Sequence, residues 1–169
     1  MRSVAATVAT VVAATVAVLC LAVPPSRATA AAPVCPERTL TLRASSAGPD
    51  VVRVSVTHHG GRTCTVGRAP TVTFENLDGS ALPVPRSATG RHRLDPGDTV
   101  HAAVRTIADP SDPRARRVDA LAVAADPSHW GRAFTAAELG AGDAIGVWEP
   151  VTSWWQPSAA AADRAPGIG

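Results

Sequence analysis

This 169-residue sequence contains five histidines, whose side chains could bind a metal ion or act in catalysis. His58 and His59 are adjacent, and neighbouring residues on a strand point to opposite faces, so their rings do not converge on one metal ion. His92, His101 and His129 are scattered along the chain, whereas a zinc site needs three or four convergent ligands. We therefore expect no metal and no other cofactor, and we interpret these histidines as loop and strand-face residues.

Nucleophile motifs are the next candidates. The sequence contains neither G-x-S-x-G nor S-x-x-K, the patterns that present an activated serine in two large groups of enzymes. Ser55 and Ser128 can each be paired with a histidine on paper, but a chain with this many Ser, His and Asp residues offers such pairs by chance. We therefore expect a protein that is not an enzyme, and we keep a small secreted hydrolase that uses a histidine as the alternative hypothesis.

The aromatic residues are distributed unevenly. The chain has four Trp, two Phe and no Tyr, and all four Trp follow residue 129. Trp154 and Trp155 must face opposite sides of an extended segment. One interpretation is that these rings close a core otherwise built from Ala and Val. The other is a surface that binds a sugar or a protein partner, and Trp148, Trp154 and Trp155 are its candidate residues.

The first 30 residues have the three parts of a secretory signal, namely Arg2, an apolar run from Val4 to Val23, and small residues at 28–30. The run approaches the ~20 residues of a membrane-spanning helix. Its mildly apolar Ala and Thr residues and the breaker Pro24-Pro25 favour a cleaved leader instead. We predict cleavage after Ala30, a secreted or envelope-associated product, and no membrane span after processing.

Cleavage changes the electrostatic balance of the chain. It removes Arg2 and Arg27 and no acid, and leaves 14 Arg against 14 Asp and Glu. A neutral surface of mixed sign has no electrostatic footprint for nucleic acid. We therefore expect no nucleic-acid partner, and the expected partner is an unidentified glycan or protein of the envelope.

Cleavage also removes Cys20, so that Cys35 and Cys64 are the cysteines that remain. Two cysteines in an exported chain indicate one disulfide. Closing a loop of this length contributes roughly 3–4 kcal/mol in the chain-entropy treatment.

The elements that must position these residues are predicted from the period of two that marks half-buried strands. The alternating segments are residues 39–44, 52–57, 71–75, 81–84, 99–106, the stretch around Leu121 and Val123, and the stretch around Ile145 and Val147. Asp78-Gly79 and Pro96-Gly97 mark turns. Thr135 and Glu138 have capping-box spacing, but Gly140 limits that helix to a single turn.

These signals predict an all-β fold, an Ig-like antiparallel β-sandwich over residues 31–156, with one disulfide and at most one short helical turn. The last segment, residues 157–169, has no apolar period, and we expect it to be a disordered tail.

Several motifs follow one another in a recognisable order. Cys35 precedes the first strand, and Cys64-Thr65-Val66-Gly67-Arg68-Ala69-Pro70, Asp78-Gly79 and Leu94-Asp95-Pro96-Gly97 come after it. Over about residues 35–107 the chain resembles an actinobacterial exported family, domain of unknown function four-two-three-two. One residue is inserted between Gly67 and Pro70, and a second cysteine pair common in the family's later half is absent. The resemblance implies an Ig-like sandwich, a Cys35–Cys64 bond and an extracellular or envelope site, and it implies no activity.

Overall fold

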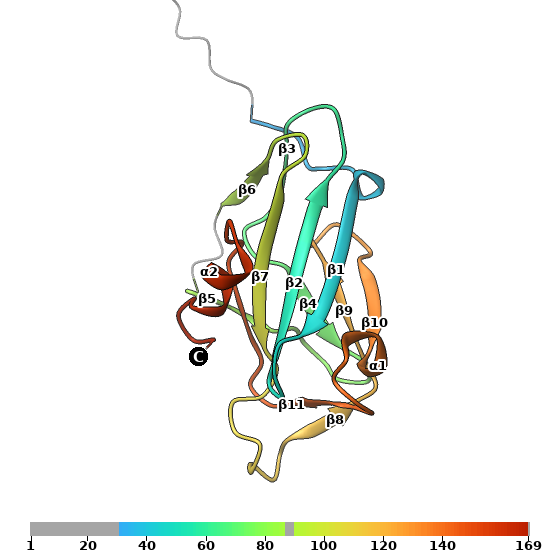
Figure 1. Cartoon of the computed structure of the whole chain (residues 1–169), viewed down its shortest axis with the longest axis vertical. Coiled ribbons are helices and arrows are strands. Elements are labelled where there is room, and N and C mark those ends of the chain that lie inside the picture. The colour runs from blue at the N-terminus through green and yellow to red at the C-terminus, as the bar shows by residue number, and fades with distance from the viewer. Residues whose placement is uncertain (1–30, 87–89, 169) are drawn as a thin grey trace, which may run out of the picture. The chain divides into compact units, whose positions relative to one another are not determined.

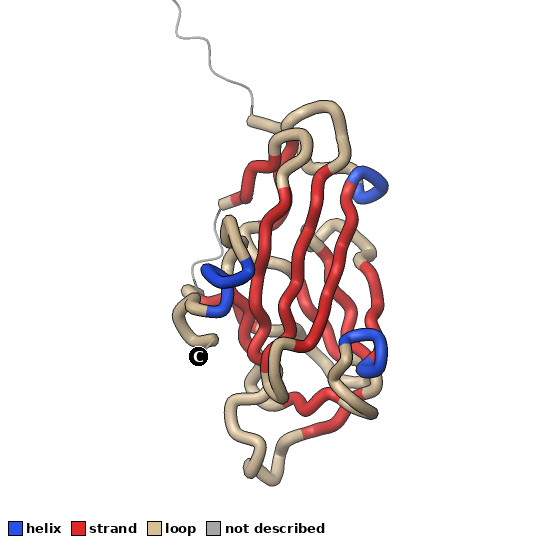
Figure 2. The backbone as a smooth tube through the Cα atoms, in the orientation of Figure 1, coloured by secondary structure: helices blue, strands red, loops and turns tan. Residues whose placement is uncertain are grey.

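The computed structural model describes residues 31–86 and 90–168. The predicted signal peptide and its cleavage site after Ala30 lie outside these residues. Strands dominate the described part, and short helices occur at its margins (Figure 2). None of these helices is long and apolar enough to cross a membrane.

One layer is a five-stranded sheet with the order β1-β2-β7-β12-β5 (Figure 1). Its strands are β1 (Leu40–Ser46), β2 (Val51–His58), β7 (Thr99–Arg105), β12 (Val151–Ser153) and β5 (Leu82–Val84). Neighbouring strands are antiparallel except for β12 and β5, which run parallel. The expected Ig-like antiparallel β-sandwich is therefore confirmed, and β12–β5 is the one parallel pair among the strands of the described residues.

The second layer is a three-stranded antiparallel sheet behind the first one (Figure 1). It consists of β10 (Arg132–Thr135), β9 (Ala120–Ala124) and β4 (Thr71–Phe74). Two short strand pairs close opposite ends of the sandwich. They are β3 (Cys64–Gly67) with β6 (Arg91–Leu94), and β8 (Arg116–Val118) with β11 (Ile145–Val147).

The core lies between the two layers and explains the alternation in the sequence. Val52, Val54 and Val56 of β2 are buried, as predicted for an inner face, and Arg53 between them is exposed. The second sheet contributes Leu121 and Phe134 to the same cluster. Because every second side chain of a strand points to one face, this pattern requires two apposed sheets.

The loop after β4 switches the chain from one sheet to the other. Thr73 and Ser80 form an antiparallel bridge around the predicted Asp78-Gly79 turn, and Gly79 has a φ of 95°. No hairpin continues from it, because β5 leaves β4 and pairs with β12. The turn therefore comes to lie beside the segment that precedes β12.

The described residues contain three short helices, where the sequence predicted at most one helical turn. They are η1 (Glu37–Thr39), α1 (Ala136–Leu139) and α2 (Ala159–Asp163). The predicted capping box of α1 is confirmed. Thr135 Oγ1 accepts from the Glu138 amide at 3.2 Å, and Glu138 Oε2 accepts from the Thr135 amide at 2.8 Å. Gly140 ends the helix in the left-handed region, at a φ of 73°.

The chain end is ordered, which corrects the prediction of a disordered tail over residues 157–168. Ser158 caps α2, and Ala162, Ala165 and Ile168 are buried against Ala103 on the outer face of β7. The Asp163 carboxylate also accepts three hydrogen bonds from the Arg53 guanidinium. The tail carries little apolar volume, but Ala103 is small enough to let it approach the sheet closely.

Candidate functional site

The three tryptophans of the predicted binding surface lie in different environments. Trp155 is only 4% exposed and belongs to the core, whereas Trp148 and Trp154 are partly exposed. The expectation that Trp154 and Trp155 face opposite sides is therefore confirmed. Trp155 itself is removed from the candidate surface, because its ring packs between the sheets. Trp130, which was not a candidate, is 96% exposed.

Trp154 is held by contacts within the protein. Its Nε1 donates to the Pro85 carbonyl at 3.1 Å, and the Arg68 guanidinium lies 3.9 Å from its ring centroid. The ring borders a groove of ≈ 260 Å³ that extends over Gly67, Pro70, Ala81 and Pro83. Its indole N–H and one ring face are thus already used inside the protein.

Trp148 lines a larger groove, called the Trp148 groove below, with a volume of ≈ 450 Å³. The remaining lining residues come from the end of β4 and the loop after it, from the start of β8 and the loop before it, and from the end of β11 and the segment between β11 and β12. They are Phe74, Leu77, Asp78, Gly79, Ser80, Arg114, Arg116, Val147, Glu149 and Pro150. Ser80 lines both the Trp148 groove and the smaller groove beside Trp154, so the two grooves adjoin at this residue.

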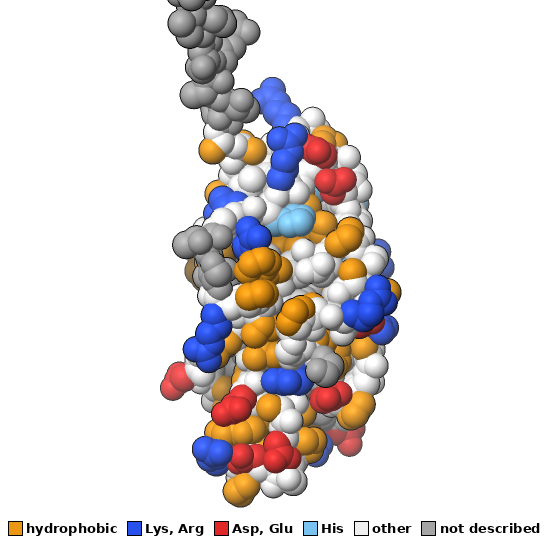
Figure 3. Space-filling model, turned by 90° about the vertical axis from the view of Figure 1, so that its left-hand side faces the viewer, with side chains coloured by type: hydrophobic (Ala, Val, Ile, Leu, Met, Phe, Trp, Pro, Cys, Tyr) orange, Lys and Arg blue, Asp and Glu red, His pale blue; other side chains and the backbone are white. Residues whose placement is uncertain are grey.

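Figure 3 shows the molecule from the side on which α2 and β5 lie in Figure 1. Apolar side chains form a band along the middle of this face. Side chains of both charges gather at the lower end, which is the end that β8 and β11 occupy in Figure 1. The Trp148 groove is built from this end of the fold, so apolar and charged groups occur together in its walls.

The position of Trp148 is fixed by backbone and side-chain contacts. Its amide donates to the Thr106 carbonyl at 3.0 Å, and its carbonyl accepts from the Ala108 amide at 2.9 Å. The Arg114 guanidinium lies 4.2 Å from the ring centroid. Asp112 orients that guanidinium through bonds of 2.9–3.0 Å, and this contact lowers the pKa of Asp112 below its ordinary value. The indole is therefore preorganised.

Polar groups in the Trp148 groove have bonding capacity left. Among residues 31–86 and 90–168, the carboxylates of Asp78 and Glu149 form neither an ion pair nor a hydrogen bond. The Trp148 Nε1–H likewise has no acceptor in this part of the chain. An aromatic surface is thus flanked by one free donor and two free acceptor groups.

Glu149 has an unfavourable backbone conformation. Its φ is 46°, in the left-handed region that a residue with a Cβ adopts at a cost of about 1–3 kcal/mol. The Trp148 bonds on one side and the bond from the Leu82 amide to the Pro150 carbonyl on the other hold it there. Such backbone strain occurs preferentially at functional positions. The conformation of Glu149 therefore supports the Trp148 groove as the candidate functional site.

A third groove, of ≈ 570 Å³, is lined by residues of β1, β2, β7, β10, α1 and α2 and was missed by the sequence analysis. Its basic residues include Arg43, Arg53 and Arg132. Arg53 is paired with Asp163, and Arg132 lies 3.9 Å from Glu138. The sequence does indicate this groove, because Arg43 and Arg53 stand at outward-facing positions of two alternating strands. Because two of its three arginines have acidic partners, this groove is a weaker candidate than the Trp148 groove.

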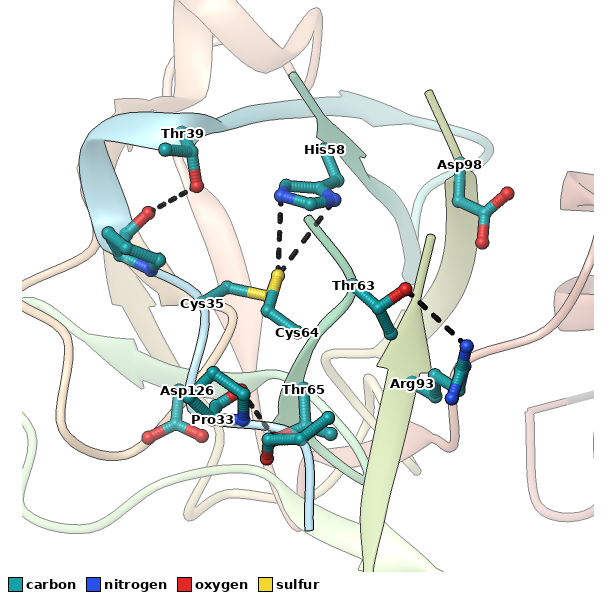
Figure 4. The surroundings of a disulfide bond; sticks show 12 residues. Pro33, Cys35, Thr39, His58, Thr63, Cys64, Thr65, Arg93, Asp98 and Asp126 are labelled. Atoms are coloured by element: carbon teal, nitrogen blue, oxygen red, sulfur yellow. Dashed lines mark hydrogen bonds between the residues drawn. A yellow bond between two sulfur atoms is a disulfide. The ribbon is translucent and has the colours of Figure 1, made fainter. Parts of the chain in front are cut away.

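The opposite end of the sandwich contains the disulfide (Figure 4). Cys35 and Cys64 are bonded, as predicted. His58 packs on the sulfur of Cys64, and His129 Nε2 lies 2.9 Å from the Cys35 carbonyl. Within the described ranges, no histidine ring forms a hydrogen bond with a carboxylate or a hydroxyl group, although His101 lies opposite Ser55 in the β2–β7 pair. These contacts give the hydrolase hypothesis no support.

The fold and its grooves define the class of this protein: a disulfide-bonded, Ig-like β-sandwich domain with a tryptophan-lined groove at the β8–β11 end. The family model of a domain of unknown function, DUF4232, matches residues 35–155, and the chain therefore belongs to that family. The match continues well beyond the 35–107 segment that carried the resemblance in the sequence. Neither the curated proteins nor the solved structures compared with this chain include one that matches it.

Proposed function

We propose that this chain is a non-enzymatic binding domain that works outside the cell or at its envelope, and that the Trp148 groove binds a glycan. The predicted signal peptide and the disulfide support the location, since stable disulfides form in oxidising compartments. The groove supports the binding role, because it combines a tryptophan ring with polar groups whose bonding capacity is free.

The observation that carries the proposal is the set of groups around Trp148. Arg114 occupies one face of the Trp148 indole, so the other face provides apolar area for the C–H face of a sugar, and the N–H can donate to one of its oxygens. Asp78 and Glu149 provide carboxylates that accept from sugar hydroxyl groups. Because the fold already holds the Trp148 indole in place, a ligand does not have to order this ring.

The size of the groove favours a glycan over a protein partner. Its ≈ 450 Å³ lies within the range of about 300–1,000 Å³ for small-molecule sites. A stable protein interface covers about 800 Å² on each partner, usually around a flat apolar centre. A groove of this volume fits one or a few sugar units of a polymer.

The experiment is a pull-down of envelope polysaccharides with the full chain expressed for export. Trp148→Ala should reduce recovery of the bound polymer at least tenfold, and Asp78→Asn with Glu149→Gln should also weaken it. Trp130→Ala is the matched control, since that tryptophan is exposed and does not line the groove. Equal recovery by wild type and Trp148→Ala would rule out this site.

A further inference from the structure

Two arginines and two serines form a square on the outer face of the five-stranded sheet. Arg43 of β1 lies opposite Ser55 of β2, and Ser45 lies opposite Arg53 in the same strand pair. All four alternate with residues that face the core, so they project from the other side of the sheet. The two arginines are diagonal neighbours, with their Cα atoms about 7–8 Å apart. The sheet therefore brings two guanidinium groups and two hydroxyl groups together.

These side chains line the groove of ≈ 570 Å³, called the Arg43 groove below. Ala159 of α2 also lines it, as does Arg132 of β10, which lies beyond the edge strand β1. Figure 1 shows α2 over β7 and α1 beside the lower part of β1. His101, which lies opposite Ser55 on β7, contributes an imidazole ring. The lining holds three arginines against one carboxylate, that of Glu138, so positive charge prevails.

Most donors of the square are unused. Within residues 31–86 and 90–168, the side chains of Arg43, Ser45 and Ser55 form neither a hydrogen bond nor an ion pair. A guanidinium has five N–H donors and no acceptor, and each serine hydroxyl group has one O–H donor. The Arg43 groove thus presents positive charge and hydrogen-bond donors, which are the groups that bind an oxyanion.

The Arg53 guanidinium already binds an oxyanion from the chain itself. Its Nε lies 2.9 Å from Oδ1 of Asp163, and its Nη2 lies 2.7 Å from Oδ2. This is the forked geometry in which arginine binds carboxylate and phosphate groups. Asp163 belongs to α2, which packs on Ala103 of β7 in a small cluster separate from the main core. The carboxylate can therefore leave Arg53 without opening the core.

We propose that the Arg43 groove binds a phosphate monoester or inorganic phosphate between Arg43 and Arg53, and that Asp163 competes with it. A carboxylate has two oxygens, and the fork of one arginine uses both of them, as Asp163 shows. A terminal phosphate has at least three free oxygens and a charge of about −1.5 to −2 at pH 7. It can therefore accept from both arginines and also from the hydroxyl groups of Ser45 and Ser55.

The test titrates the full chain, expressed for export and labelled with nitrogen-15, with inorganic phosphate. The arginine Nε–H resonances are followed at low ionic strength, because salt screens exposed charges. Arg43→Gln and Arg53→Gln should each raise the Kd for phosphate at least fivefold. Arg62→Gln is the matched control, because it removes the same charge at an exposed position outside the groove. Equal losses in all three variants would overturn the proposal.

Asp163→Asn gives the prediction that is most specific to this site. It removes the carboxylate that competes for Arg53, so the Kd for phosphate should fall at least threefold. A role of Asp163 in holding Arg53 for the ligand would change the Kd in the opposite direction. Unchanged or weaker phosphate binding by Asp163→Asn would overturn the competition.

Other ligands test which oxyanion the groove selects. Acetate and dimethyl phosphate have two free oxygens each, and both should bind at least fivefold more weakly than inorganic phosphate. Equal binding of acetate would overturn the proposal. Tighter binding of glucose 6-phosphate would identify a phosphorylated sugar as the source of the group, and equal binding would identify free phosphate. Trp148→Ala should leave phosphate binding unchanged, because the two grooves share no lining residue.

Discussion

Trp148 and Trp155 are both tryptophans, but they lie in different environments and have different roles. Trp155 fills the core, whereas Trp148 lines a groove and is stacked on Arg114. We expect Trp155→Ala to lower the free energy of unfolding by about 3–5 kcal/mol, because it leaves a cavity the size of an indole. Trp148→Ala should lower it by less than about 1 kcal/mol. Urea denaturation measures both, and similar losses would contradict the assigned environments.

Asp126 is a buried carboxylate at the disulfide end. Burial by itself would raise its pKa, but hydrogen bonds from Ser128 and from Arg91 outweigh burial and hold the pKa below its ordinary value of 3.8. A carboxyl group whose pKa is lower in the folded state stabilises the fold above its unfolded pKa. This contribution is lost as the pH falls through the folded pKa.

We therefore expect the free energy of unfolding of the wild type to decrease on acidification below about pH 4. Asp126→Asn should be less stable at neutral pH and should lose less stability between pH 5 and pH 2, because it has no proton to gain there. Urea denaturation across this range measures both slopes. Parallel curves for the two proteins would contradict the role of Asp126.

At the scale of elements, the sequence predicted strands well where one face is buried. In β2 and β7 the alternation places Val54 and Ala102 inside, as expected. All four residues of β3 are buried, and β12 has three residues, of which Thr152 and Ser153 are buried. Such segments have no alternation to detect. The parallel β5–β12 pair depends on where a loop leads and was likewise not predictable from local pattern.

The candidate site was predicted in part for the same reason. Sequence reasoning located Trp148 and Trp154 and required Trp154 and Trp155 to face apart. It could not decide which of the two turns inward, because that depends on the register of β12 against β7. Asp78 joins the groove only because the chain switches sheets between β4 and β5.

The C-terminal element gives a further prediction. Removal of residues 157–169 exposes Ala103 and takes away the buried Ile168 together with the Arg53–Asp163 ion pair. Burying one isoleucine contributes about 1.5–3 kcal/mol, so the truncated chain should unfold at lower urea concentration by a similar free energy. Asp163→Asn is the control and should cost less than about 1 kcal/mol, as exposed ion pairs do. An unchanged midpoint on truncation would show that the tail adds nothing.

At the scale of the whole molecule, one disulfide joins the segment before β1 to β3 across 29 residues. Replacing both cysteines with alanine frees this loop in the unfolded chain and should lower the free energy of unfolding by roughly 3–4 kcal/mol. Because the sandwich has a core of its own, the variant should keep its β-type circular dichroism at low temperature. A loss below about 1 kcal/mol, or complete unfolding, would contradict this division between core and disulfide.

Binding through the Trp148 groove is the central claim about this molecule, and its four tryptophans allow a direct measurement. Labelling the full chain with 5-fluorotryptophan gives one fluorine resonance for each tryptophan, assigned by single substitutions. On titration with solubilised envelope polysaccharide, the Trp148 resonance should shift in a saturable manner, while those of Trp130 and the buried Trp155 stay in place. A saturable shift of Trp130 with Trp148 unmoved, or no shift with any envelope polymer, would contradict the account.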